Sequence, residues 1–278
     1  MSGMLSLCAT PIGNLEDITL RVIRTLKEAD RVYAEDTRHT RGLLSHLQIK
    51  KPLISCHEHN ENERAAEIVD RVRSGERIAY VSDAGMPGIS DPGAKLAHAA
   101  IEEGIPFEVL PGASALPMAA VLSGLDIDRL LFLGFLPRTN KERRELLLAR
   151  VHEPCTMILY ESPQRVAETL AELCEYWGDR SAALMRELTK LYEETRRGTL
   201  RSLAEECSAT LVRGECVIAV AGAGPDAKER SESPDEMLLK LLSQGMSVKD
   251  AAKQASAVLE MPKNEAYELA LRLQSQRR

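Results

Sequence analysis

The segment 78–93, IAYVSDAGMPGISDPG, constrains the fold of this chain more than any other stretch. An apolar run, 78–81, predicts a strand that ends at Ser82 and Asp83, and three glycines and two prolines follow. No strand or helix continues through such a run, because proline lacks a ladder donor and both residue types destabilise a helix interior. We interpret the run as a ligand-binding loop at the carboxyl end of a strand. A tight strand–helix connection is the alternative.

Apolar runs alternate with helical patterns through the first half of the chain. The predicted strands are 5–9, 32–34, 53–56, 78–81 and 107–110. The predicted helices are 19–29, 41–47, 62–74 and 94–103. Such alternation is typical of βαβ units and of a mostly parallel sheet.

The pattern partly restarts after Pro111-Gly112 and becomes purely helical near the carboxyl end. Further strands are predicted at 130–136, 156–160, 182–185 and 217–221, and further helices at 113–122, 163–176 and 200–211. The predicted domains are an α/β domain (1–115), a second α/β domain (116–224) and a linker with a helical segment (225–278). Met261-Pro262 separates two short helical stretches that resemble a helix-turn-helix, although most such helix pairs simply pack together.

The charge and cysteine content narrow the class of protein. A formal net charge of -6 argues against a generally basic nucleic-acid coat, so an RNA contact needs a local basic patch. The six cysteines are scattered, with no C-x-x-C pair, which favours a reducing cytoplasm over a disulfide framework or a zinc ribbon. The start of the sequence lacks a basic n-region, and no run approaches the roughly 18 apolar residues of a membrane helix. We therefore expect a cytoplasmic protein without a membrane contact.

Four unusual segments follow predicted strands, and neither a Walker loop nor a G-x-G-x-x-G motif occurs. They are TPIGNL (10–15), AEDTRHTR (34–41), SDAGMPGISDPG (82–93) and LPGASA (110–115). In a parallel sheet the carboxyl ends of the strands share one edge, so these four segments are expected to converge on a pocket there.

Charged clusters supply the candidates for chemistry and for RNA contact. Glu35, Asp36 and Arg38 pack acids beside a base, which suits either a solvated helix start or the positioning and deprotonation of a hydroxyl. Glu187 and Lys190 in RELTK could face the site from the second domain. His57-Glu58-His59 lacks further ligands, so no metal site is expected. The candidate phosphate contacts are Arg41, Arg138, Lys141, Arg143 and Arg144.

The motifs TPIGNL, AEDTR, VSDAG-P-ISDPG, LPG-SA, GFLPR, YES--R and RELTK together resemble the tetrapyrrole-methylase superfamily. Within it, the resemblance is to the bacterial branch that methylates a ribose 2′-oxygen of ribosomal RNA. It covers about residues 5–222. It implies a class III S-adenosylmethionine-dependent methyltransferase: two α/β domains with the cofactor in the cleft between them, usually as a homodimer. The implied substrate is a cytidine of 16S rRNA in the decoding centre of the small ribosomal subunit.

The resemblance also implies which residues contact S-adenosylmethionine. The implied cofactor-binding residues are Pro11, Asp83, Ala84, Gly85, Met86, Pro87, Ser114, Ala115, Leu133, Gly134 and Ala219. Met86 departs from the family pattern, which has a smaller residue such as threonine at this position.

Methyl transfer needs an oxygen held in line with the donor and a base that takes its proton. We expect Asp36 or Glu35 to be that base, with Arg38 holding a phosphate or the carboxylate; Glu187 and Lys190 are the second choice. Two alternatives stay open. One is a methylase of the same fold that acts on a tetrapyrrole or a diphthamide precursor, and the other is a non-catalytic ribosome-associated binding module.

Overall fold

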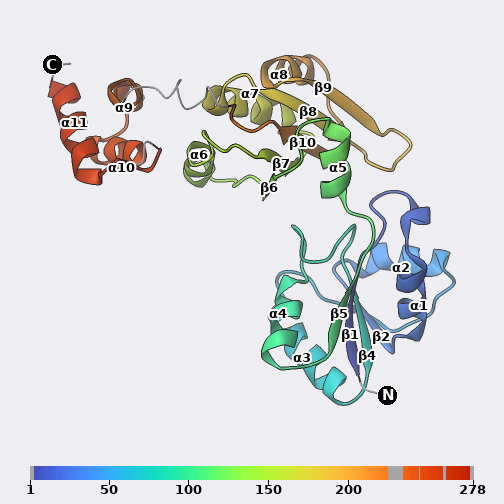
Figure 1. Ribbon diagram of the computed structural model, residues 1–278. Coiled ribbons are helices and arrows are strands. Elements are labelled where there is room, and N and C mark those ends of the chain that lie inside the picture. The colour runs from blue at the N-terminus through green and yellow to red at the C-terminus, as the bar shows by residue number, and fades with distance from the viewer. Residues whose placement is uncertain (1–2, 225–233, 244, 259–260, 276–278) are drawn as a thin grey trace. The chain divides into compact units, whose positions relative to one another are not determined.

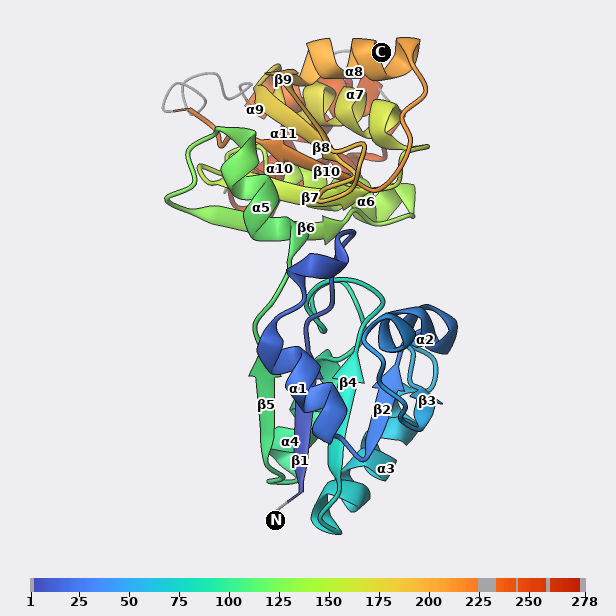
Figure 2. The same ribbon diagram turned by 90° about the vertical axis from the view of Figure 1, so that its right-hand side faces the viewer.

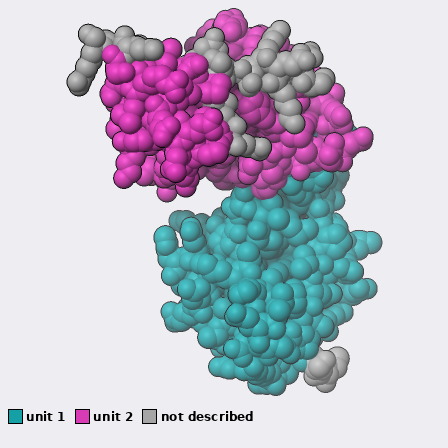
Figure 3. All heavy atoms as spheres, turned by 60° about the vertical axis from the view of Figure 1, so that its left-hand side comes forward, with its two compact units in different colours: residues 1–122, 185–195 teal, residues 123–184, 196–278 magenta. Residues whose placement is uncertain are grey.

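The chain divides into two compact units, each described here by itself (Figure 3). The computed structural model describes residues 3–224, 234–243, 245–258 and 261–275, without the side chains of 236, 240, 257 and 258. Unit 1 comprises Met1–Leu122 and Met185–Thr195, and unit 2 comprises Ser123–Leu184 and Arg196–Arg278. The division after residue 122 falls within a helix, α5 (Ala115–Ser123), near the domain boundary predicted at 115.

Unit 1 is built on a five-stranded sheet (Figure 1). Its strands are β1 (Met4–Cys8), β2 (Arg31–Ala34), β3 (Leu53–Ser55), β4 (Arg77–Val81) and β5 (Phe107–Leu110). The strand order is β3-β2-β4-β1-β5, and all four neighbouring pairs are parallel. The prediction of a parallel sheet is therefore confirmed.

Helices cover both faces of this sheet (Figure 1). They are α1 (Leu20–Glu28), α2 (Thr37–His46), α3 (Glu61–Arg73) and α4 (Ala94–Glu102). The period-two alternation of the strands divides their side chains between two cores. Tyr33 and Tyr80 are buried with α3 and α4, whereas Val32 and Val81 are buried with α1 and α2. Both faces are apolar because both are covered.

The helix α2 begins earlier than the sequence predicted. Asp36 is its N-cap, and the Asp36 carboxylate accepts a hydrogen bond from the backbone N–H of Arg38. The predicted start at Arg41 rested on the apolar positions, which begin only after the polar first turn. The AEDTR cluster is thus partly the solvated helix start that was one of its two interpretations.

The second sheet has the order β6-β7-β10-β8-β9. Its strands are β6 (Leu130–Phe135), β7 (Thr156–Glu161), β8 (Ser181–Arg186), β9 (Glu194–Thr199) and β10 (Cys216–Val220). Pair β6–β7 is parallel and pair β7–β10 is antiparallel. The edge strand β9 was not predicted, because its sequence ETRRGT contains no apolar residue to mark a strand.

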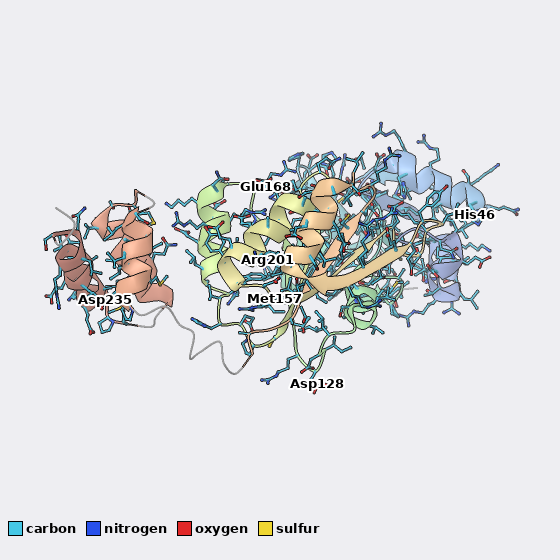
Figure 4. All side chains as sticks on the ribbon, turned by 90° about the horizontal axis from the view of Figure 1, so that it is seen from above. His46, Asp128, Met157, Glu168, Arg201 and Asp235 are labelled. Atoms are coloured by element: carbon cyan, nitrogen blue, oxygen red, sulfur yellow. The ribbon has the colours of Figure 1, made fainter. Side chains whose placement is uncertain are left out.

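Three helices complete the second α/β layer: α6 (Asn140–Leu148), α7 (Val166–Trp177) and α8 (Leu200–Ala209). Their apolar side chains share one core with β7, β8 and β10, in which Met157, Leu173 and Leu203 are at most 1 % exposed. Figure 2 shows α7 and α8 packed side by side, and Figure 4 labels Glu168 on α7 and Arg201 at the start of α8.

The carboxyl-terminal part of unit 2 is helical where the structure describes it. Its helices are α9 (Pro234–Ser243), α10 (Val248–Val258) and α11 (Lys263–Ser275). Leu238, Ala255 and Ala270 are fully buried in a small core of their own. Met261-Pro262 separates α10 from α11, as predicted. Among the described residues, no helix is both long and apolar enough to cross a membrane.

Candidate active site

The strand order of unit 1 places the four unusual segments next to one another. They follow β2, β4, β1 and β5, which are consecutive neighbours in the sheet. All these strands run parallel, so their carboxyl ends lie at the same edge. The four segments therefore meet at one edge of the sheet, as predicted, and a pocket between them stays a prediction. Ligands of open α/β sheets bind at this edge.

Paired backbone hydrogen bonds join the segments after β1 and β4. The Thr10 N–H donates to the Gly85 carbonyl (2.9 Å), and the Gly85 N–H donates to the Thr10 carbonyl (3.0 Å). The Thr10 hydroxyl also donates to the Ser82 carbonyl (3.2 Å). Gly85 has φ +78, and a Cβ added there would lie 3.3 Å from Ile12 Cγ2. Glycine therefore suits this position both by its conformation and by its size.

The rest of the 82–93 loop is closed on itself by backbone contacts. The Gly88 N–H donates to the Pro92 carbonyl (3.0 Å), and Gly93 adopts φ +126. A Cβ on Gly93 would lie 3.0 Å from Pro87 Cβ and 3.1 Å from Gly88 N. These contacts give the loop a defined conformation. Ala84 and Met86 are partly exposed in this loop, whereas Gly85 and Pro87 are buried.

Glu61, the first residue of α3, holds the far end of this loop, and the sequence analysis missed it. The Gly93 N–H donates to Glu61 Oε1 (2.8 Å), and Lys95 Nζ lies 3.7 Å from Glu61 Oε2. Glu61 is only 3 % exposed. A carboxylate is almost never buried this far unless it is paired. In the sequence, Glu61 is one of several charged residues at the start of a charged helix. Such a residue is expected to be exposed to solvent, so the sequence alone did not single it out.

Asp36 ties the β2 segment to the β4 loop. The Asp36 N–H donates to Asp83 Oδ1 (2.9 Å), so the two strand ends are linked through a side chain. The Asp36 carboxylate caps α2 and accepts two hydrogen bonds from the guanidinium of Arg38 (3.1 and 2.7 Å). The hydrogen bonds from Arg38 lower the pKa of Asp36. A carboxylate held in this way is a weak base.

Glu35 has the opposite environment. Burial raises the pKa of Glu35, and the nearby charge of Asp83 raises it further. Its Oε2 atom is buried and has no hydrogen-bond partner in the described part of the chain. Two adjacent carboxylates thus have pKa values shifted in opposite directions, which is typical of acid–base sites.

Glu187 and Lys190 lie in a loop that clusters with unit 1. Lys190 Nζ pairs with Glu187 Oε1 at 2.9 Å. A Cβ added to Gly13 would lie 2.4 Å from Lys190 Cγ and 2.8 Å from Thr189 Oγ1. The structure therefore places the RELTK loop directly on the turn after β1, as a neighbour of the four segments.

The implied cofactor-binding residues divide between the two units. Pro11, Ser114 and Ala115 lie with the 83–87 loop in unit 1, at the ends of β1 and β5, and each is partly buried. Leu133 and Gly134 lie in unit 2 at a register shift of β6, where Gly134 has φ +62. Ala219 is fully buried in β10. Contact of all these residues with the cofactor stays a prediction.

The predicted RNA-binding residues differ in accessibility. Arg41, Arg138 and Lys141 are exposed, and Arg144 is partly buried. Arg143 is only 5 % exposed; it donates to Glu172 and to the Thr169 hydroxyl (2.8 Å). Its guanidinium is a structural cation that joins α6 to α7. Arg143 is therefore left out of the RNA contacts proposed below.

A groove of about 730 Å³ lies beside α6 within unit 2. Lys141, Arg144 and Lys253 contribute cations to its lining, and Glu145 and Asp250 contribute acids. The rings of His57 and His59 in the H-E-H motif contact each other edge to face, with their centroids 5.9 Å apart. Among the residues that the structure describes, no group of three or more His, Cys, Asp or Glu is placed to hold a metal ion.

Comparison with known proteins assigns the class. The family model of the tetrapyrrole (corrin/porphyrin) methylases matches residues 4–204, and a model described as the RsmI C-terminal HTH domain matches residues 231–274. The chain belongs to the tetrapyrrole methylase family. The predicted fold class, two α/β domains of a class III S-adenosylmethionine-dependent methyltransferase with a helical carboxyl-terminal segment, is confirmed, and with it the family's methyl donor.

The most informative relatives share a single description. The chain is 43% identical to ribosomal RNA small subunit methyltransferase I of Halalkalibacterium halodurans over 272 residues, covering 96% of this chain and 94% of that protein. It is 42% identical to the protein of the same name from Synechocystis sp. over 276 residues, covering 98% and 99%. It is 40% identical to the Bacillus subtilis protein of that name, covering 96% and 93%.

Solved structures share the fold at low identity. Cobalt precorrin-4 methyltransferase CbiF has a TM-score of 0.58 at 18% identity, covering 79% of this chain and 95% of that one. Diphthine synthase has a TM-score of 0.59 at 16% identity, covering 79% and 90%. Uroporphyrin-III C-methyltransferase from Thermus thermophilus, complexed with S-adenosyl homocysteine, has 0.56 at 19%, covering 79% and 97%.

The site residues of unit 1 fit a methyl donor of this kind. Glycines let the segments pack closely against one another: a Cβ on Gly112 would lie 2.8 Å from Ala9 Cβ, and one on Gly85 would lie 3.3 Å from Ile12 Cγ2. Asp83, Ala84 and Met86 are partly exposed beside these glycines, and the Asp83 carboxylate is a hydrogen-bond acceptor. Ligand pockets use a few such polar groups to orient what they bind.

The role of Glu61 is tested by removing its carboxylate. We expect Glu61→Ala to lower the free energy of unfolding by about 1–3 kcal/mol, because the buried Gly93 N–H loses its acceptor. The rate of amide hydrogen exchange at Gly93 should rise by the factor that corresponds to this loss of free energy. Glu61→Gln keeps an acceptor and should cost less. Urea unfolding and NMR-detected hydrogen exchange measure both quantities.

The matched control is Glu63→Ala, which removes an exposed acid from the same helical turn. It should leave Gly93 exchange unchanged. Equal stability and equal Gly93 exchange in Glu61→Ala and in the unsubstituted protein would show that Glu61 does not hold the loop.

Proposed function

We propose that this protein transfers a methyl group from S-adenosylmethionine to the ribose 2′-oxygen of a cytidine in 16S rRNA, in the decoding centre of the small ribosomal subunit. The observation that carries the proposal is the 40–43% identity to rRNA small subunit methyltransferases I over nearly the whole length of each protein. The tetrapyrrole and diphthine enzymes align at 16–22% and share the fold alone. The match of the helical segment to a helix-turn-helix model supports the same substrate class.

The chemistry requires little more than position and a base. S-adenosylmethionine supplies an electrophilic methyl group on a sulfonium. The protein must hold the 2′-oxygen in line and accept its proton, because a ribose hydroxyl is a poor nucleophile at neutral pH. The partly exposed 82–93 loop and its neighbours would hold the donor. The AEDTR segment, next to it at the sheet edge, would hold the acceptor.

Glu35 is the better of the two candidate bases. The pKa of Glu35 is raised towards neutral pH, which makes its carboxylate a stronger base. Its Oε2 atom has no hydrogen-bond partner in the described part of the chain and can accept a proton. The Asp36 carboxylate already accepts hydrogen bonds from the α2 backbone and from the Arg38 guanidinium, and these bonds lower its pKa. Asp36 and Arg38 then act as positioning groups that orient the segment after β2. Glu187 and Lys190, paired with each other beside Gly13, are the second choice.

RNA contact would use exposed or partly exposed cations in spite of the acidic net charge. Arg41 and Arg138 are exposed, and Lys141, Arg144 and Lys253 line the groove beside α6. Lysine and arginine contacts to phosphate position an RNA without reading its sequence. A small number of such contacts predicts an affinity that falls moderately with salt concentration.

A homodimer in the cytoplasm is also proposed. The edge strand β6 is apolar throughout, and its Leu130 and Phe135 are 40% and 58% exposed. An exposed apolar edge strand is a hazard unless a partner covers it. All six cysteines are free thiols, in keeping with a reducing compartment.

The function is tested by the transfer of labelled methyl from S-adenosylmethionine. Small ribosomal subunits, naked 16S rRNA and a uroporphyrinogen-type acceptor are offered in parallel. We expect label in small subunits or in naked 16S rRNA and none in the uroporphyrinogen-type acceptor. Nuclease digestion should locate the label at a 2′-O-methylcytidine. Label only in the small acceptor would favour a tetrapyrrole methylase, and label in none of them would favour a binding module.

The base is tested by conservative amide substitutions. Glu35→Gln should lower the turnover about 10²- to 10⁴-fold, the usual contribution of a general base. Asp36→Asn keeps an N-cap side chain and should lower turnover much less. Because Glu35 acts only when ionised, its raised pKa moves the acid limb of the pH–rate profile above the ordinary range of a glutamate.

Calorimetric titration with S-adenosylhomocysteine serves as the control, and both variants should bind it normally. Near-normal turnover in Glu35→Gln and in Asp36→Asn, with cofactor binding intact, would remove both residues from the proton transfer.

A further inference from the structure

The loop between β8 and β9 has a backbone that is held in an unfavourable conformation. Glu187 has φ +52 and Thr189 has φ +67, although neither is glycine. Such residues persist only where the surrounding contacts fix them, and they cluster at functional sites. The conformation is therefore a reason to ask what the loop presents.

Local contacts fix this loop. The Lys190 N–H donates to the Glu187 carbonyl (3.0 Å), and the Glu193 N–H donates to the Lys190 carbonyl (3.0 Å). The Thr189 N–H donates to the Glu193 carboxylate (2.6 Å). Leu188 is 6 % exposed and anchors the loop. The loop is thus a preorganised structure.

Its position is set by Gly13. Leu188 carbonyl oxygen, Thr189 Oγ1 and Lys190 Cγ all lie within 3.1 Å of where a Gly13 Cβ would be. This contact lies within unit 1, on the turn that leaves β1 at the carboxyl edge of the sheet. The loop is therefore seated at the edge where the methyl acceptor has to arrive.

The loop presents two large apolar side chains to solvent. Leu191 is 89% exposed and Tyr192 is 70% exposed. The charges around them are paired within the loop: Lys190 with Glu187 (2.9 Å) and Arg186 with Glu194 (2.5 Å). A partner would thus be recognised through the flat face of Tyr192 and the apolar side chain of Leu191 rather than through charge.

We propose that Tyr192, flanked by Leu191, is a stacking platform for an unstacked base of the RNA substrate. The proposal rests on the proposed function and names how that substrate is recognised. Sequence-specific RNA recognition targets single-stranded segments whose bases are unstacked, and aromatic side chains then receive such a base. Tyrosine is suited to this because it offers a rigid ring at small conformational cost.

A second copy of this chain is a less suitable occupant. A stable interface buries roughly 800 Å² on each partner and involves 20–30 residues a side. Leu191 and Tyr192 form a two-residue projection flanked by paired charges, whereas β6 provides a longer apolar surface elsewhere in the molecule. The size of the projection matches a nucleobase.

The test is a coupling cycle between Tyr192 and the base. Fluorescence anisotropy measures binding of a short single-stranded oligocytidylate and of an abasic ribose-phosphate chain of equal length. The unsubstituted protein should prefer the oligocytidylate by about tenfold or more. Tyr192→Ala should lose this preference and bind both chains alike, and Tyr192→Phe should keep it. Ile101→Ala, an exposed apolar residue on α4, is the matched control and should change nothing.

Each outcome decides the proposal. No preference for the base in the unsubstituted protein, or an undiminished preference in Tyr192→Ala, overturns it. A change of sedimentation coefficient in Tyr192→Ala without a change in RNA preference would assign the pair to an interface between copies instead. Methyl transfer to small subunits, measured in parallel with the unsubstituted protein, tests the proposed function separately, since the base preference is read without turnover.

Discussion

The reciprocal hydrogen bonds between Thr10 and Gly85 are the contact on which the candidate site depends. They form one further bridge past the ends of β1 and β4. This bridge is antiparallel, whereas the two strands themselves pair in parallel. The chain after β4 has to turn back to make that bridge. Glycine suits the turn best, because φ +78 is strained for other residues and a Cβ there would lie only 3.3 Å from Ile12 Cγ2. The course of the 82–93 loop follows from this turn.

Two further hydrogen bonds connect the 82–93 loop to the neighbouring segments after β2 and β3. Asp83 accepts the Asp36 N–H and so fixes the start of α2, while Glu61 accepts the Gly93 N–H and fixes the end of the loop. Glu35 and Asp36 consequently occupy different environments although they are adjacent in the chain. One carboxyl is partly buried beside another acid, and the other is saturated with donors. The site thus obtains a candidate base and a positioning group from one dipeptide.

Much of unit 1 could be predicted from the sequence because its strands are apolar and its loops are marked by glycine and proline. The convergence of the four segments followed from parallel topology alone. The failures have physical causes. Strand β9 carries polar residues and is defined by its ladder, Arg143 is buried by partners on α7, and Glu61 is buried by a loop distant in sequence. Tertiary partners of charged residues leave no periodic signal.

The most direct measurement is calorimetric titration of Gly85→Ala with S-adenosylhomocysteine. The matched control is Gly104→Ala, which introduces a similar left-handed strain (φ +63) at an open position with no atom within 4 Å. Circular dichroism establishes that both variants are folded. The account predicts that Gly85→Ala loses cofactor affinity by about tenfold or more, equivalent to ~1.4 kcal/mol, whereas Gly104→Ala binds as the unsubstituted protein does. Unchanged affinity in a folded Gly85→Ala variant would contradict it.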